Sequence, residues 1–269
     1  MTTPYALTIP IPRHLWMTTT GTETIDDRAR TRARLRKRGR DAWRQARRLG
    51  ARPVDRYLLT VTVRGRGNES PILAAETLKP LIDAGTDTGL WPDDDPWHRA
   101  MTCYLQDPRP ATGPSVALTV IPLGGEESPV ERLMGCTPGA QGVSRGMLIP
   151  DTEWLTSNMR ETPGTRRMKQ TRVMRRAAPL WEGIRMRDCA VVTGIRYPDS
   201  RRKYKGDPDN TAETATAMWG AGVATGALPA RPSLFAFMLM PGQSPPHTHG
   251  MSMLVFDTPT GFNWLAALV

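Results

Sequence analysis

One motif occurs twice in this chain, and the repeat constrains the fold more than any other feature. Residues 69–94 and 206–231 align without a gap at a constant offset of 137 residues. Self-similarity over this length indicates that the chain contains two copies of one structural unit. The identical pairs are Pro71/Pro208, Ala75/Ala212, Glu76/Glu213, Thr77/Thr214, Ala84/Ala221, Gly85/Gly222, Thr88/Thr225, Gly89/Gly226 and Pro92/Pro229.

The two copies differ at positions that could carry chemistry, and the differences are reciprocal. The later copy has an acidic pair, Asp207 and Asp209, that the earlier copy lacks. The earlier copy has Lys79 and an acidic run, residues 93–95, that the later copy lacks. The counterparts of these groups are Ser70, Ile72, Thr216 and residues 230–232. Each copy therefore keeps a different part of one set of polar side chains.

Hydrophobic patterning predicts the same order of elements in both halves. β-branched, roughly alternating runs predict strands, and the repeated motif predicts a helix of roughly three turns that ends near Gly85 or Gly222. Short apolar segments, residues 6–12 and 146–150, open the two halves. The predicted strands are residues 57–63, 100–105, 116–121, 189–197, 234–240 and 251–256.

These elements predict an α+β fold made of two tandem copies that form a pseudo-dimer. Strands and helices interleave, so each copy is expected to be a mixed sheet with packed helices. Residues 124–146 combine Gly, Pro, Ser and charge without a strong period, which is typical of a linker. We therefore predict copy one over residues 1–123, the linker over 124–146 and copy two over 147–269.

The net charge of +10 indicates an anionic partner, because 36 Lys and Arg face 26 Asp and Glu. Most of the cations are Arg, whose planar fork suits phosphate. Nucleic acid is the leading partner, ahead of an anionic membrane surface, for which no amphipathic anchor is evident. No apolar window is long enough for a transmembrane helix, and the N-terminus does not resemble a signal peptide. A cytoplasmic protein with reduced cysteines is the expectation.

Three basic runs are predicted to bind DNA. In the first, residues 28–48, like charges at helical spacing repel one another, and an anionic partner would relieve this repulsion. The predicted apolar stripe of this helix passes through Ala33, Ala42, Trp43 and Ala46. A solvated basic face or a disordered arm is the alternative. The candidate DNA-binding residues are Arg34, Arg36, Lys37, Arg38, Arg40 and Arg44, then Arg166, Arg167, Lys169 and Arg172, then Arg201, Arg202, Lys203 and Lys205.

The acidic pair is a candidate magnesium site. Mg²⁺ binds one or two carboxylates together with water and substrate phosphate. A bound ion could polarise a phosphodiester and activate a water molecule, and a nearby Lys could offset the developing charge. Asp207 and Asp209 are followed by Asn210, which is expected to support them. The sequence Asp-Pro-Asp-Asn would also suit an ordinary surface turn.

The wider segment resembles the RusA family of Holliday junction resolvases. The family pattern is a DxDN motif, a Lys seven residues after its second Asp, a Gly, and a short turn into an acidic run. Here the DxDN motif is residues 207–210, the Lys counterpart is Lys79, and the acidic run lies in residues 91–95. The resemblance implies a small α+β endonuclease that acts as a homodimer on four-way DNA junctions and cleaves with Asp-bound Mg²⁺, or with Mn²⁺ in its place.

Neither half has the whole set, which suggests one composite site. Asp207 and Asp209 of copy two, with Asp94 and Asp93 of copy one, would be metal ligands. Lys79 would stabilise the transition state. A single such site should nick one strand, and paired cuts would require two chains to associate as a homodimer. If the parts do not meet, the chain is a non-catalytic DNA-junction-binding protein derived from a resolvase.

Two further interpretations carry less weight. RNA binding would depend on stacking against aromatic side chains, and the aromatic content is only 6%. His247 and His249 have the spacing of a metal-binding pair. Their Pro- and Gly-flanked context favours a loop before a strand.

Overall fold

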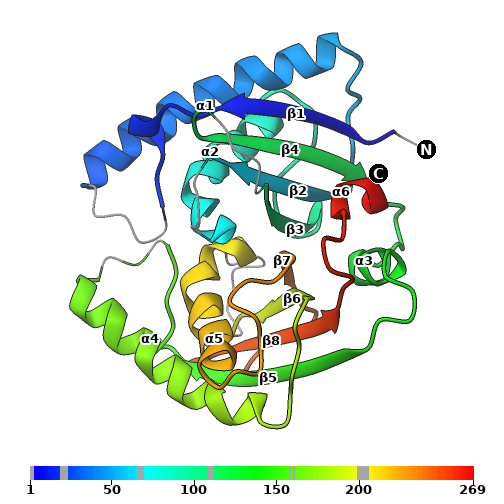
Figure 1. Ribbon diagram of the computed structural model, residues 1–269. Coiled ribbons are helices and arrows are strands. Elements are labelled where there is room, and N and C mark those ends of the chain that lie inside the picture. The colour runs from blue at the N-terminus through cyan, green and yellow to red at the C-terminus, as the bar shows by residue number, and fades with distance from the viewer. Residues whose placement is uncertain are drawn as a thin grey trace. The chain divides into compact units, whose positions relative to one another are not determined.

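The computed structural model describes residues 3–18, 24–65, 70–107, 112–157, 159, 161–198 and 206–269. The chain divides into two compact units, and Figure 1 shows strands and helices in both. Unit 1 comprises Met1–Cys136 with Trp264–Val269, and unit 2 comprises Thr137–Asn263. This composition confirms the α+β class.

The described residues of unit 1 form a four-stranded mixed sheet in the order β1-β4-β2-β3. β1 pairs antiparallel with β4, β4 pairs antiparallel with β2, and β2 pairs parallel with β3. The helix α1 packs on α2 and against β1. The elements are β1 (Tyr5–Pro10), η1 (Arg13–Leu15), α1 (Ile25–Arg48), β2 (Tyr57–Arg64), η2 (Pro71–Ala74), α2 (Ala75–Asp87), β3 (Arg99–Gln106), β4 (Ser115–Pro122), α3 (Pro129–Gly135) and α6 (Trp264–Leu268).

The described residues of unit 2 form a sheet in the order β5-β8-β6-β7, with the same sequence of antiparallel, antiparallel and parallel pairings. Here α4 packs on α5. The two units therefore share one topology. The elements are β5 (Gly142–Pro150), α4 (Pro163–Ala177), η3 (Ala178–Trp181), β6 (Cys189–Arg196), η4 (Pro208–Thr211), α5 (Ala212–Ala224), β7 (Leu234–Leu239) and β8 (Thr248–Asp257).

The predicted strands and motif helices are confirmed, and the division between the two units lies within the segment that was predicted as a linker. Residues 124–146 contain α3 and the start of β5, so this segment is not an irregular linker throughout. The division falls between Cys136 and Thr137. The last helix, α6, belongs to unit 1, where the Arg132 guanidinium donates a 3.2 Å hydrogen bond to the Leu268 carbonyl.

The motif helices α2 and α5 are largely buried, and the same internal hydrogen bonds hold both. The Thr77 hydroxyl bonds to the backbone N–H and C=O of Met17, each at 2.8 Å. Thr214 makes the corresponding pair of bonds to Leu155, at 3.0 and 2.9 Å. A buried polar group without a partner would cost free energy, so these bonds explain why both units have Thr at this position.

A buried tryptophan links each basic helix region to its motif helix. The Trp43 indole N–H donates to the Leu81 carbonyl at 2.8 Å. In unit 2 the Trp181 indole N–H donates to the Met218 carbonyl at 3.1 Å. After each motif helix the chain turns at a glycine, Gly89 or Gly226, with φ of 68° in both. That backbone conformation disfavours any residue with a side chain, which accounts for the repeated Gly.

The helix α1 buries a different stripe from the one predicted. Leu35, Gly39 and Trp43 are its buried residues, whereas Ala33 is exposed. Of the predicted stripe, Trp43 is buried, Ala42 and Ala46 are half-buried, and Ala33 is exposed. Gly39 lies in this stripe because α1 and α2 approach closely. A Cβ placed there would lie 2.7 Å from the Ala84 Cβ and 3.1 Å from the Leu81 Cα.

None of the helices in the described parts of the chain has both the length and the apolar character that crossing a membrane requires.

The close approach at Gly39 gives a stability prediction. We expect Gly39→Ala to lower the free energy of unfolding by about 1–3 kcal/mol, because overpacking outweighs the higher helix propensity of Ala. Gly220→Ala in α5 is the matched control. A Cβ there would meet only the Met174 Cε at 3.6 Å, so a gain of up to about 1 kcal/mol is expected. Urea denaturation measures both, and a stabilising Gly39→Ala would contradict the packing argument.

Candidate metal and nucleic-acid-binding residues

The acidic pair of unit 2 lies where η4 leads into α5. Asp207 is the N-cap residue of η4, and Asp209 lies in its first turn. The Asp209 side chain is buried, with 6% relative exposure. Its counterpart in unit 1 is Ile72, which is 1% exposed. Unit 2 therefore places a carboxylate at a position where unit 1 places an apolar side chain.

The two carboxylates create a negative field that reaches a neighbouring tyrosine. The Tyr197 hydroxyl, at the end of β6, donates a 3.5 Å hydrogen bond to the Asp207 carbonyl. Burial raises the pKa of Tyr197, and the charges of Asp207 and Asp209 raise it further. Tyr197 was not among the residues predicted for this region from the sequence. Its position directly after a predicted strand and ten residues before Asp207 was the only available signal.

Asn210 holds the acidic motif in place. Its backbone N–H donates to the Asp207 carbonyl at 3.0 Å, which closes the first turn of η4. Its side-chain Oδ1 accepts a 3.1 Å hydrogen bond from the Ser157 hydroxyl, and its carbonyl accepts one of 2.9 Å from the Ser157 backbone N–H. These bonds connect the turn of the acidic motif to Ser157, and the supporting role of Asn210 in a metal site stays a prediction.

In unit 1, Lys79 lies beside two carboxylates. Its ammonium is 3.7 Å from the Asp94 carboxylate and 3.8 Å from that of Asp83. The structure therefore brings together the two catalytic candidates of copy one. Asp94 is half-buried, whereas Asp93 is exposed and accepts a 2.7 Å hydrogen bond from the Asp94 backbone N–H.

Asp95, the last residue of the acidic run, organises the turn into β3. Its carboxylate accepts hydrogen bonds from the backbone N–H groups of Trp97 and His98, at 2.8 and 3.0 Å. The His98 Nδ1 lies 3.0 Å from the same oxygen. These local bonds give Asp95 a structural role.

The acidic pair of unit 2 has the chemistry of a magnesium site in part. Asp207 and Asp209 offer carboxylate oxygens of the kind that Mg²⁺ binds, and water and substrate phosphate would have to complete its coordination. Across the described residues, however, no three His, Cys, Asp or Glu side chains gather as a metal-binding group. A composite site, which would need Asp94 and Lys79 of unit 1 together with the acidic pair of unit 2, stays a prediction.

Some cations that were predicted to bind DNA are bound within the protein instead. Arg166 pairs with the buried carboxylate of Glu213 and also donates to the Met159 carbonyl. Lys169 is 7% exposed and contacts Glu161 at 2.5 Å. In unit 1, Arg36 forms a bidentate pair with Asp87, with both contacts at 2.7 Å, and this pairing lowers the pKa of Asp87.

Other predicted cations face solvent. Arg34, Lys37, Arg167 and Arg172 are exposed on the basic helices. Arg44 lies 3.8 Å from Asp41, and Arg40 lies 3.9 Å from Asp87. The third basic run, Arg201, Arg202, Lys203 and Lys205, lies outside the described residues.

The histidine pair lies next to the first strand of unit 2. His247 is in the loop and β8 begins at Thr248, as the loop interpretation predicted. The His249 ring stacks on Trp154 at 4.3 Å, and its Nδ1 is 3.1 Å from the Asp151 carboxylate. His249 therefore helps to pack the start of β8 against the end of β5.

Neither of two comparisons with known proteins identifies a relative. No family model matches the chain, and a search of curated proteins finds no significant match.

Two neighbouring arginines of α4 test the difference between a cation that pairs inside the protein and one that is exposed to solvent. We expect Arg166→Gln to lower the free energy of unfolding by about 3 kcal/mol, because it leaves the buried Glu213 carboxylate without its guanidinium. Arg167→Gln, on the exposed face, should change it by less than about 0.5 kcal/mol. Thermal and urea denaturation measure both. Equal effects would show that Arg166 is not a structural residue.

Proposed function

We propose that this protein is a Mg²⁺-dependent endonuclease that acts on four-way junctions or other branched DNA in recombination, repair or phage DNA processing. The observation that carries the proposal is the buried Asp209 carboxylate. Burying a carboxylate costs free energy that an apolar side chain avoids, and the same position in unit 1 is filled by Ile72. A site that binds a cation gives a reason for keeping the acid.

The residues of unit 2 are suited to holding a divalent cation. Asp207 and Asp209 would be its ligands, and the bonds between Asn210 and Ser157 fix the turn that presents them. The bound ion would polarise a phosphodiester and lower the pKa of a water molecule. A negative field that already raises the pKa of Tyr197 favours a cation at this position.

Lys79 and Asp94 are proposed to complete this site. An ammonium group near the scissile phosphate would stabilise the charge that develops in the transition state. The contacts of Lys79 with Asp83 and Asp94 restrict the rotation of its side chain. The side chain therefore loses its conformational entropy on folding and not when substrate binds. With one such set, each chain would cut one strand.

We also propose that the two units arose by tandem duplication. They share strand order, pairing direction, and the hydrogen bonds of Thr77/Thr214 and Trp43/Trp181. Independent origins would not require equivalent residues to make equivalent contacts at a nearly constant sequence offset.

A second candidate function is DNA binding without cleavage. The ion pairs of Lys79 with Asp83 and Asp94 favour it, because they give both catalytic candidates of unit 1 a sufficient structural role. In that case the protein would keep its exposed cations and bind branched DNA without cutting it.

Cleavage of an end-labelled four-way junction in Mg²⁺ distinguishes the two candidates. We expect wild type to nick the junction, and Asp209→Asn and Asp94→Asn to lower the nicking rate by about 100-fold or more, as losses at charge-stabilising groups do. Junction binding in EDTA should be unchanged, since neither carboxylate contacts phosphate without the ion.

Asp83→Asn is the matched control for Asp94→Asn. Both carboxylates lie at almost the same distance from the Lys79 ammonium, 3.8 and 3.7 Å. If Asp94 only positions Lys79, the two variants should lose activity equally, and the metal-ligand role of Asp94 fails. Tight binding by wild type without any nicking, in Mg²⁺ or Mn²⁺, would instead establish the non-catalytic candidate.

A further inference from the structure

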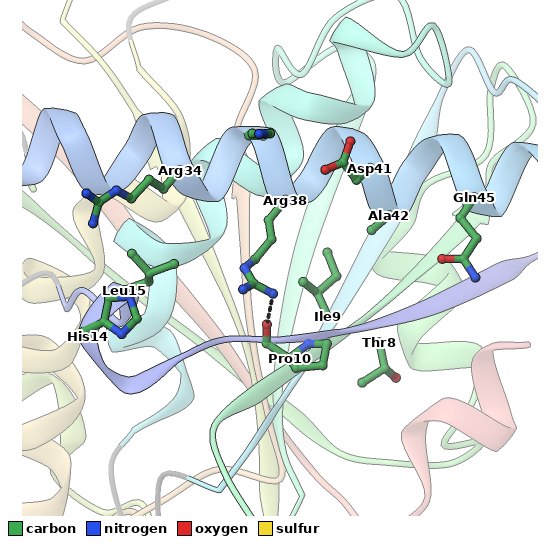
Figure 2. A pocket seen from close by; sticks show the side chains of 11 residues that line it. Thr8, Ile9, Pro10, His14, Leu15, Arg34, Arg38, Asp41, Ala42 and Gln45 are labelled. Atoms are coloured by element: carbon green, nitrogen blue, oxygen red, sulfur yellow. Dashed lines mark hydrogen bonds between the residues drawn. The ribbon is translucent and has the colours of Figure 1, made fainter.

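Unit 1 contains a groove between the basic helix α1 and the first strand β1, with η1 at one end (Figure 2). Its volume is about 690 Å³. β1 is the outer strand of the four-stranded sheet of unit 1. The lining residues are Thr8, Ile9, Pro10, His14, Leu15, Arg34, Lys37, Arg38, Asp41, Ala42 and Gln45.

Three of the lining residues, Arg34, Lys37 and Arg38, are cations spaced so that they share one face of α1. All three are exposed. Figure 2 shows Arg38 directed towards β1, where its guanidinium donates a 3.5 Å hydrogen bond to the Pro10 carbonyl. The only acidic residue of the lining, Asp41, lies 3.8 Å from Arg44. The groove therefore carries a net positive charge.

The groove cations differ from the arginines of α1 that pair with carboxylates of α2. Arg28 and Arg32 lie 3.9 and 2.6 Å from the buried Glu76 carboxylate. Arg36 pairs with Asp87. These arginines dock α1 on α2, and their charge is offset within the protein. Arg34, Lys37 and Arg38 have no carboxylate within salt-bridge distance among the described residues, so their charge is available to an external anion.

Unit 2 has a matching triad on α4. The buried pairs Leu35/Val173, Gly39/Ala177 and Trp43/Trp181 align the two helix regions at an offset of 138 residues. At that offset the groove cations correspond to Arg172, Arg175 and Arg176. One member differs in its surroundings, because Arg176 forms a bidentate pair with Glu153 at 3.1 and 3.2 Å.

We propose that the α1–β1 groove binds the phosphodiester backbone of nucleic acid, and that it contributes more to binding than the matching face of α4. The proposal rests on the nucleic-acid partner of the proposed function and adds where that partner is held. Guanidinium and ammonium groups that neutralise phosphates release counterions, which gives affinity without sequence preference. The α4 triad offers one cation fewer, since Glu153 already offsets Arg176.

Charge-neutralised triads test the proposal. We would compare Arg34→Gln/Lys37→Gln/Arg38→Gln with Arg172→Gln/Arg175→Gln/Arg176→Gln, which change the net charge equally at equivalent positions. Binding of a labelled DNA duplex and a four-way junction is measured in EDTA over a range of salt. The groove variant should lower the slope of log affinity against log salt by about 2.7, at about 0.9 per phosphate contact, and the α4 variant by about 1.8 or less.

Each outcome decides the proposal. A groove variant with unchanged affinity and slope, or with a smaller loss than the α4 variant, overturns it while leaving the nuclease proposal intact. Wild type that binds no nucleic acid would remove both proposals. Because EDTA prevents metal-dependent cleavage, a failure of catalysis alone does not affect the result. Circular dichroism of both variants should match wild type, because all six side chains are exposed.

The positive charge of the α1–β1 groove would also suit a negatively charged protein segment. Competition with polyglutamate distinguishes it from nucleic acid. Loss of polyglutamate binding in the groove variant, with DNA binding unchanged, would assign the groove to an acidic protein and contradict the proposal.

Discussion

The burial of the motif helices α2 and α5 is the constraint on which both units depend. A helix that is buried on most of its positions must satisfy its polar groups inside the protein. Thr77 and Thr214 do so by bonding the segment that follows the first strand, and Glu76 and Glu213 by pairing with arginines of the basic helices. Part of the dense positive charge of α1 and α4 therefore serves to pair with buried carboxylates of the motif helices.

This constraint explains the repeated motif of the sequence. The identical positions are largely those that the buried helix needs, such as the Thr that bonds the preceding segment and the Gly at the following turn. The positions that differ carry the polar groups of the proposed chemistry. Asp209 replaces a buried Ile72, and Lys79 corresponds to an exposed Thr216. The two units thus share the same buried framework and differ in their exposed and polar side chains.

Local patterns were sufficient to predict the strands and motif helices, because alternation and helix-ending glycines are local signals. The presence of the C-terminal helix α6 in unit 1 was not predictable from local patterns. It depends on contacts between residues far apart in sequence, such as that of Arg132 with Leu268. The sequence also did not indicate which arginines form ion pairs inside the protein and which are exposed. Arg166 and Arg167 are adjacent in sequence and opposite in role, and only the docked face of α4 distinguishes them. Part of the candidate site was foreseen, but Tyr197 and the groove beside β1 were not.

We propose that the residues by which the two units differ serve one metal site. Binding of Mn²⁺, followed by electron paramagnetic resonance without DNA, tests it most directly because it requires no catalysis. We expect wild type to bind the ion, and Asp209→Asn and Asp94→Asn each to weaken binding by at least about tenfold, since even outer-shell partners of a metal contribute about 10- to 100-fold to its affinity. Unchanged affinity in Asp209→Asn would contradict the metal site, and unchanged affinity in Asp94→Asn alone would contradict its composite nature.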